Sequence, residues 1–220
     1  MDYVVFDLEF TVLRQRQYSA DILEIGAIKL DDEDGNLSMV DLFHTYVRPS
    51  NRSAITAQTT QFTGITQEQV DTAPSFTEAV TDFKQWLGDR TYYLCSWGPD
   101  DKHQLLRHCN RHQIGMDWIR NFNDFQLMFT RLQSSDHGQR WGLKKALEHA
   151  QIPFFGNHHN ALDDAFNTAK LFARTFPQLS LQENNAADEM SYSTRLVYST
   201  GDDEKHNPFS QLADLLGTAI

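Results

Sequence analysis

The segment Tyr3-Val4-Val5-Phe6-Asp7-Leu8-Glu9-Phe10 decides the fold. Apart from its two acids it consists of apolar and aromatic residues, so it predicts a largely buried strand. Residues i and i+2 of a strand point to the same face, so Asp7 and Glu9 converge while Leu8 faces the core. Two carboxylates on one face of a buried strand are costly unless a cation pairs them, and Mg²⁺ and Mn²⁺ prefer such oxygen ligands. The segment therefore indicates either a metal site or a strand end with two exposed acids.

The chain around this segment predicts an α/β fold. Residues 22–30 (ILEIGAIKL) and 40–47 predict two further strands, which form an antiparallel meander with the first. Helix-start signals at Thr66 and at Pro74-Ser75 follow. Alternating strands and helices complete the pattern, which predicts a mixed five-stranded sheet with helices on both faces. The later strands are expected at 91–96 and 121–125, and the later helices at 101–112, at 126–132, at 142–150 and at 160–176.

Length and composition exclude several classes of protein. The chain has 220 residues, of which 40% are hydrophobic and 22% charged, as in an ordinary globular protein. No apolar run reaches the roughly 18–20 residues that span a bilayer, and the N-terminus does not resemble a signal peptide. Cys95 and Cys109 are too few for a disulfide framework or a cysteine-based zinc site. We therefore expect a cytoplasmic protein without membrane contact.

Charge is unevenly distributed along the chain, whose formal net charge is −11. The region 102–145 carries eight lysines and arginines against three aspartates, and it predicts either solvated helix faces or a phosphate-binding patch. From residue 181 onward the sequence is polar and acidic, so we predict a folded domain at 1–180 and a flexible tail at 181–220. Residues 208–216 of the tail predict a short amphipathic helix, which would dock on a protein partner or pack on its own domain.

Two further segments carry candidate functional residues. Ser96-Trp97-Gly98-Pro99-Asp100-Asp101 lies where a predicted strand enters a helix, which is where open α/β sheets bind ligands. A turn whose aspartate caps the helix explains this segment equally simply. In His158-His159-Asn160-Ala161-Leu162-Asp163-Asp164, Asn160 is the expected N-cap, and the helix dipole alone would favour both aspartates. A histidine beside metal-binding carboxylates could instead deprotonate a water molecule.

Taken together, these three motifs resemble those of the DEDDh 3′–5′ exonucleases, the DnaQ-like branch of the ribonuclease H-like fold, and are most similar to the KapD-like subgroup. The resemblance covers roughly residues 1–176 and includes Gln61-Phe62-Thr63-Gly64-Ile65-Thr66, which is similar to the segment after the family's third strand. It implies the hydrolysis of single-stranded RNA or DNA from the 3′ end to nucleoside 5′-monophosphates. Two divalent cations, Mg²⁺ or Mn²⁺, and a histidine general base belong to this expectation.

The resemblance also implies roles for individual residues. Asp7 and Glu9 match the ligands of the first motif, and the family's Trp-Gly-x-x-Asp wording selects Asp101 over Asp100. The spacing His-x4-Asp fits both His158 with Asp163 and His159 with Asp164, and the family's His-x-Ala-Leu-Asp-Asp wording selects the second pair. The implied metal ligands are thus Asp7, Glu9, Asp101 and Asp164, and the implied base is His159. The implied substrate-binding residues are Phe10, Thr11 and Phe76, although the helical stripe gives Phe76 a competing role in the core.

Two alternatives stay open at the level of sequence. Phe6-Asp7-Leu8-Glu9-Phe10-Thr11 faintly resembles the Asp-x-Asp-x-Thr signature of haloacid dehalogenase-like phosphatases, in which Asp7 would be a covalent nucleophile. That interpretation leaves Asp101 and His159 without a function. The second alternative is a catalytically weak binding module that the tail recruits to a nucleic acid or protein partner. The choice between RNA and DNA, the pathway and the oligomeric state do not follow from the sequence.

Overall fold

The first strand lies at the centre of a five-stranded sheet with the order β3-β2-β1-β4-β5. The computed structural model describes residues 1–12, 20–33, 36–50, 54–133 and 139–187. The strands β1, β2 and β3 pair antiparallel, whereas β4 pairs parallel to both β1 and β5. The predicted mixed sheet is therefore confirmed. The strands are β1 (Asp2–Phe10), β2 (Ile22–Glu33), β3 (Asn36–Tyr46), β4 (Tyr92–Ser96) and β5 (Phe122–Asp124).

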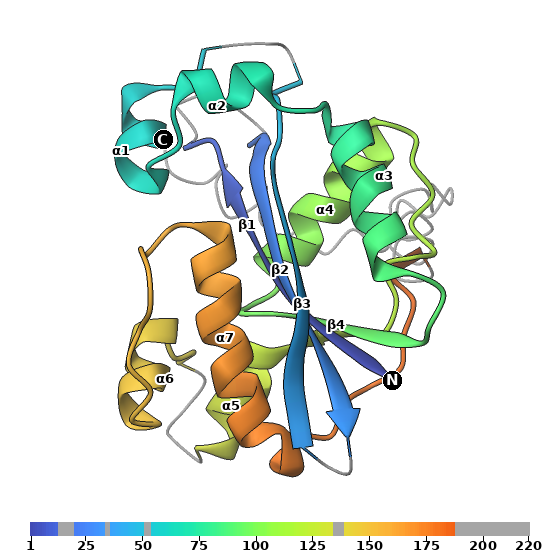
Figure 1. Cartoon of the computed structure of the whole chain (residues 1–220), viewed down its shortest axis with the longest axis vertical. Helices are drawn as coiled ribbons and strands as arrows, with labels where there is room; N and C mark the ends of the chain where they lie inside the picture. Colours follow the sequence, from blue (N-terminus) through green and yellow to red (C-terminus); the bar gives the residue numbers. More distant parts are fainter. Residues whose placement is uncertain (13–19, 34–35, 51–53, 134–138, 188–220) are drawn as a thin grey trace, which may run out of the picture. The chain divides into compact units, whose positions relative to one another are not determined.

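Helices cover both faces of this sheet, as Figure 1 shows. The α3 helix (Phe76–Leu87) buries the predicted apolar stripe, and its Phe83 ring lies 6.5 Å from that of Phe6 in β1. The α4 helix (Asp100–Arg111) follows β4 on this side. On the other face, Tyr3 and Val5 of β1 belong to a core cluster shared with three further helices. These are α5 (Phe125–Leu132), α6 (Leu143–His149) and α7 (Ala161–Thr175).

Short helices connect β3 to α3. The α2 helix (Gln67–Thr72) begins with the predicted capping box, in which the side chains of Thr66 and Gln69 each bond the other's backbone amide. The α1 helix (Ala57–Thr63) was not expected from the sequence. A 3-10 turn, η1 (Phe176–Gln178), follows α7. Within the described ranges, every helix is too short or too polar to cross a bilayer.

The compact unit extends beyond the predicted domain boundary at residue 180 and ends at Ala187. Asn184 Oδ1 accepts a hydrogen bond from the Phe122 amide, and the Ala186 amide donates to the Ile119 carbonyl. Residues 182–186 therefore pack against the compact unit, beyond the position where the sequence analysis placed the domain boundary. The remainder of the predicted tail, including the helix expected at 208–216, lies outside the described residues.

Candidate active site

Asp7 and Glu9 lie on the face of β1 that α7 covers. Strand alternation places them there together with Tyr3 and Val5, while Leu8 is buried on the opposite face. Across the antiparallel pair, Asp7 lies opposite Gly26 of β2. The convergence that the sequence predicts for the two acids is thus present.

Asp101 contacts β1 just beyond the point where the pairing of β1 with β4 ends. The parallel ladder runs only to Val5 and Cys95, so Leu8, which pairs with Ile25 of β2, has no partner from β4 on its other side. Asp101 is 7% exposed and its Oδ1 accepts that amide hydrogen bond at 3.2 Å. Asp100 is exposed to solvent. The side chain of Asp101, rather than that of Asp100, therefore faces the first motif.

The third motif brings His159 and Asp164 to the same place. Asp164 Oδ2 accepts a hydrogen bond from the His159 amide at 2.9 Å, and His159 adopts a left-handed backbone with φ of 62°. Potential ligand atoms of Glu9, His159 and Asp164 lie within 4.8 Å of one another. Asp163 instead accepts the Asn157 amide at 2.8 Å, which commits it to the loop before α7.

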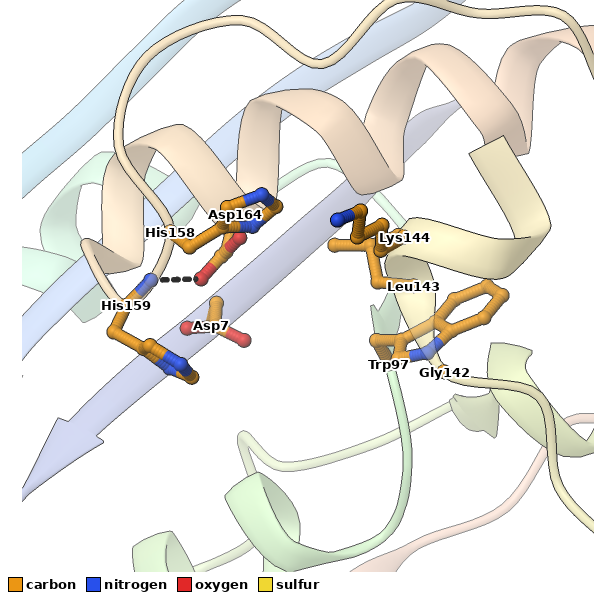
Figure 2. Close-up of a pocket in the computed structure, with 8 residues that line it drawn as sticks. All are labelled: Asp7, Trp97, Gly142, Leu143, Lys144, His158, His159 and Asp164. Atoms are coloured by element: carbon orange, nitrogen blue, oxygen red, sulfur yellow. Dashed lines mark hydrogen bonds between the residues drawn. The ribbon is translucent and has the colours of Figure 1, made fainter. Parts of the chain in front are cut away.

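A cavity of ≈ 450 Å³ opens beside these groups. Figure 2 shows Asp7, His158, His159 and Asp164 on one side of it and Trp97 and Lys144 on the other. Gly142 and Leu143 complete its wall. The cavity is large enough for a nucleotide-sized group next to the carboxylates.

The carboxyl groups are held in an environment that disfavours their charged forms. Burial and the charge of Asp101 hold the pKa of Asp7 well above its ordinary value of 3.8. Burial raises the pKa of Glu9 to about 8, and the charge of Glu24 is the next cause. Burial also raises the pKa of Asp101 to about 7 and raises that of Asp164. Such a cluster binds either protons or cations, and its oxygen donors fit a hard divalent cation such as Mg²⁺ or Mn²⁺.

The implied substrate-binding aromatic Phe76 occupies a different place. Its ring is 3% exposed and packs on His108 and His112 of the α4 side, at centroid distances of 5.2 and 5.3 Å. A ring this enclosed has no free face for a base, so the structure supports the competing core role. Phe10 and Thr11 are partly exposed at the end of β1, next to Glu9.

Three residues at the site were not singled out from the sequence. Phe62 is 52% exposed and its ring lies 4.0 Å from that of His159. Lys144 lines the cavity, and Glu24 is buried beneath the start of α7. A glutamate inside the otherwise apolar segment 22–28 is the one signal that could have drawn attention to Glu24.

Comparison with known proteins gives a consistent family assignment. The sequence model described as Exonuclease matches residues 4–172. The chain is 30% identical over 176 residues to the probable 3′-5′ exonuclease KapD of Bacillus subtilis, covering 77% of this chain and 82% of that protein. It is 30% identical over 198 residues to ERI1 exoribonuclease 2 of Danio rerio, where it spans 78% of this chain but 34% of the relative.

Solved structures share the fold. The nuclease domain of 3'hExo, described as a DEDDh family member bound to rAMP, superposes with a TM-score of 0.72 at 24% identity, over 83% of this chain and 96% of that chain. Cell-death related nuclease 4 superposes with a TM-score of 0.68 at 20% identity, over 84% of this chain and 66% of that chain. The chain therefore belongs to the Exonuclease family, and the resemblance to the DEDDh 3′–5′ exonucleases is confirmed.

Proposed function

We propose that this chain hydrolyses single-stranded RNA or DNA from the 3′ end and releases nucleoside 5′-monophosphates. The observation that carries the proposal is the meeting of four carboxyl groups and His159 from three distant segments beside one cavity. The relatives include proteins named as an exoribonuclease and as DNA polymerase III, so the choice between RNA and DNA is a matter for experiment.

The four carboxylates are proposed to hold two divalent cations, Mg²⁺ or Mn²⁺. When bound, such a pair supplies electrostatic stabilisation of the attacking and leaving oxygens of an in-line displacement. Asp7, Glu9, Asp101 and Asp164 contribute the oxygen donors, and the cations offset their mutual repulsion. An acidic protein then attracts the scissile phosphate to one place without a broad basic surface.

His159 is proposed to accept the proton of the attacking water. His159 is exposed, its ring packs at a tilt of 31° against that of Phe62, and its amide donates to Asp164, so it lies at the rim of the carboxylate cluster. The water oxygen bonds to phosphorus while the bond from phosphorus to the 3′ oxygen breaks. The proton passes to the imidazole, and the 3′ oxygen leaves with the shortened strand.

The test uses 5′-labelled single-stranded RNA and DNA with Mg²⁺ or Mn²⁺, and with EDTA. We expect a ladder that shortens from the 3′ end, that disappears in EDTA, and that an Asp7→Ala variant does not produce. No cleavage of either polymer by folded protein with metal present would overturn the proposal. It would favour the binding-module alternative.

Neighbouring residues of the same type provide matched controls. Asp101→Asn is expected to lower kcat on the order of 1000-fold, since a bound cation supplies several kcal/mol of transition-state stabilisation, whereas Asp100→Asn leaves kcat near that of the wild type. His159→Ala is expected to cost about 100-fold or more, and His158→Ala much less. Equal losses within either pair would contradict these assignments.

A further inference from the structure

Glu24 is a buried carboxylate that the proposed reaction does not use. It lies on β2 directly opposite Glu9, on the face that α7 covers, and its side chain is 0% exposed. Three donors surround it. They are His44 Nε2 at 2.6 Å, Asn160 Nδ2 at 3.1 Å and the Ala161 amide at 3.1 Å.

Two of these donors form the start of α7. Asn160 is the N-cap, and its Oδ1 accepts the Asp163 amide. The Ala161 amide belongs to the first helical turn, whose amides have no partner inside the helix. Glu24 therefore binds the cap residue and the first residue of the helix at once.

The backbone of β2 meets the same turn. Gly26 lies two residues after Glu24 and so faces the same side, and a Cβ atom there would lie 2.3 Å from the carbonyl carbon of Ala161. The start of α7 thus rests directly on β2, with Gly26 providing the space and Glu24 the hydrogen bonds. His44 of β3 bonds Oε1 of Glu24, the oxygen that also accepts from Asn160, whereas the Ala161 amide bonds Oε2.

The turn fixed in this way is flanked by two proposed catalytic groups. His159 immediately precedes Asn160, and the Asp164 amide donates to the Asn160 carbonyl. A shift of Asn160 and Ala161 relative to the sheet would therefore move both groups away from Asp7 and Glu9. A neutral cap would satisfy the helix amides without placing another carboxylate opposite Glu9, so helix capping alone does not account for a glutamate here.

We propose that Glu24 is a positioning residue, which together with His44 holds the start of α7 so that His159 and Asp164 face the acids of β1. It acts through the helix and contacts neither substrate nor metal. This inference rests on the proposed function for its kinetic test.

The test compares Glu24→Gln with Glu148→Gln, an exposed glutamate on α6, as the control for the charge change. For Glu24→Gln we expect kcat to fall roughly 10- to 100-fold while KM stays within about twofold, as for residues that orient the side chains in contact with a metal. Assays are run well below the Tm of both variants. A kcat within twofold of the wild type would overturn the inference.

A compensating substitution separates positioning from general destabilisation. In Glu24→Gln with Asn160→Asp, the amide and carboxylate exchange places, aspartate remains a good N-cap, and the net charge is that of the wild type. We expect this double variant to recover at least tenfold of the lost kcat. A kcat loss that follows Tm and is not recovered would assign Glu24 a purely structural role and overturn the inference.

Amide hydrogen exchange gives a readout that does not need activity. In metal-free protein, Glu24→Gln is expected to speed exchange of the amides of 161–164, while protection in α3 stays unchanged. Unchanged protection at 161–164 would contradict the inference. If the wild type cleaved no nucleic acid but this local effect were present, the proposed function alone would fail.

Discussion

Carboxyl groups crowded at the end of β1 determine how the folded protein responds to pH. The pKa of Glu9 is raised from 4.5 to about 8 and that of Asp101 from 3.8 to about 7. Between about pH 4 and pH 8 the folded state therefore binds more protons than the unfolded state. Because stability rises with pH only where the unfolded state binds more protons, this cluster makes the free energy of unfolding fall as pH rises through that window.

We expect the Tm of the metal-free protein to fall between pH 5 and pH 8 relative to that of Asp101→Asn. Mg²⁺ or Mn²⁺ at 100 times its dissociation constant should raise the Tm at pH 8 by roughly 5–10 °C, since such binding contributes about 2.7 kcal/mol. Calorimetry with and without EDTA measures both effects. A Tm difference between wild type and Asp101→Asn that does not change with pH would contradict the expected pH dependence. A Tm that metal does not change would contradict the expected stabilisation by metal.

For individual residues, the sequence predicts where some side chains lie but not others. Strand alternation places Asp7 and Glu9 on one face whatever the tertiary structure, so that prediction needs only local geometry. Asp163 and Asp164 both lie in the first turn of α7, and spacing alone does not separate them. Tertiary contacts do so, because Asp163 binds the Asn157 amide and leaves Asp164 facing the sheet. From the sequence, Phe76 fits both the apolar stripe of its helix and a position that stacks on a base. Only its packing against the α4 side separates the two roles.

At the scale of elements, the segment after η1 is expected to contribute measurably to the free energy of unfolding. Residues 182–186 bond to residues 119–123, with a bridge between Arg120 and Asn185. We expect a chain ending at 187 to keep the Tm and the activity of the full chain. A chain ending at 180 should lose about 2–5 kcal/mol of unfolding free energy, because several hydrogen bonds that each contribute about 1 kcal/mol disappear. Thermal denaturation of both truncations measures this difference, and equal Tm values would refute it.

The contact between β2 and α7 gives a second prediction for the elements. Gly26→Ala should destabilise the protein by about 1–3 kcal/mol, because its Cβ would overlap the Ala161 backbone and the helix must move. Gly142→Ala is the control, since a Cβ there meets no atom within 4 Å and its φ is −68°. Denaturant unfolding of both variants compares the costs, and a neutral Gly26→Ala would mean that α7 does not rest on β2 as described.

Elements with a strong local signal were predicted well. The capping box expected at Thr66 is present, because it needs only residues three positions apart, and the helix start expected at Ser75 carries a capping box as well. The α1 helix was missed since its polar sequence carries no apolar stripe. The first residues of β3 were missed because an exposed edge strand shows no regular alternation of apolar residues.

For the whole molecule, several cations of the basic region 102–145 are engaged by neighbouring side chains of the fold. Arg111 pairs with Asp21, Arg140 pairs with Asp124, and Lys145 lies over the Trp141 ring. Lys144 differs from these cations because it lines the cavity. A phosphate next to the scissile one would therefore meet Lys144 before the rest of the basic region.

We expect Lys144→Ala to raise KM for an oligonucleotide about threefold to tenfold and to weaken its dependence on salt, with kcat little changed. Lys145→Ala is the matched control and should leave KM unchanged. With p-nitrophenyl thymidine 5′-phosphate, which carries one phosphate, Lys144→Ala should behave like the wild type. An equal effect on both substrates would place Lys144 at the scissile phosphate instead.

The order of the acids along the chain also has a consequence during synthesis on the ribosome. Asp7 is translated before His159 and Asp164, which come near the end of the compact unit. A nascent chain that has reached α4 carries three of the four acids, but the helix that completes the cavity has not yet emerged. Any cleavage must therefore wait until α7 has left the exit tunnel and reached β2.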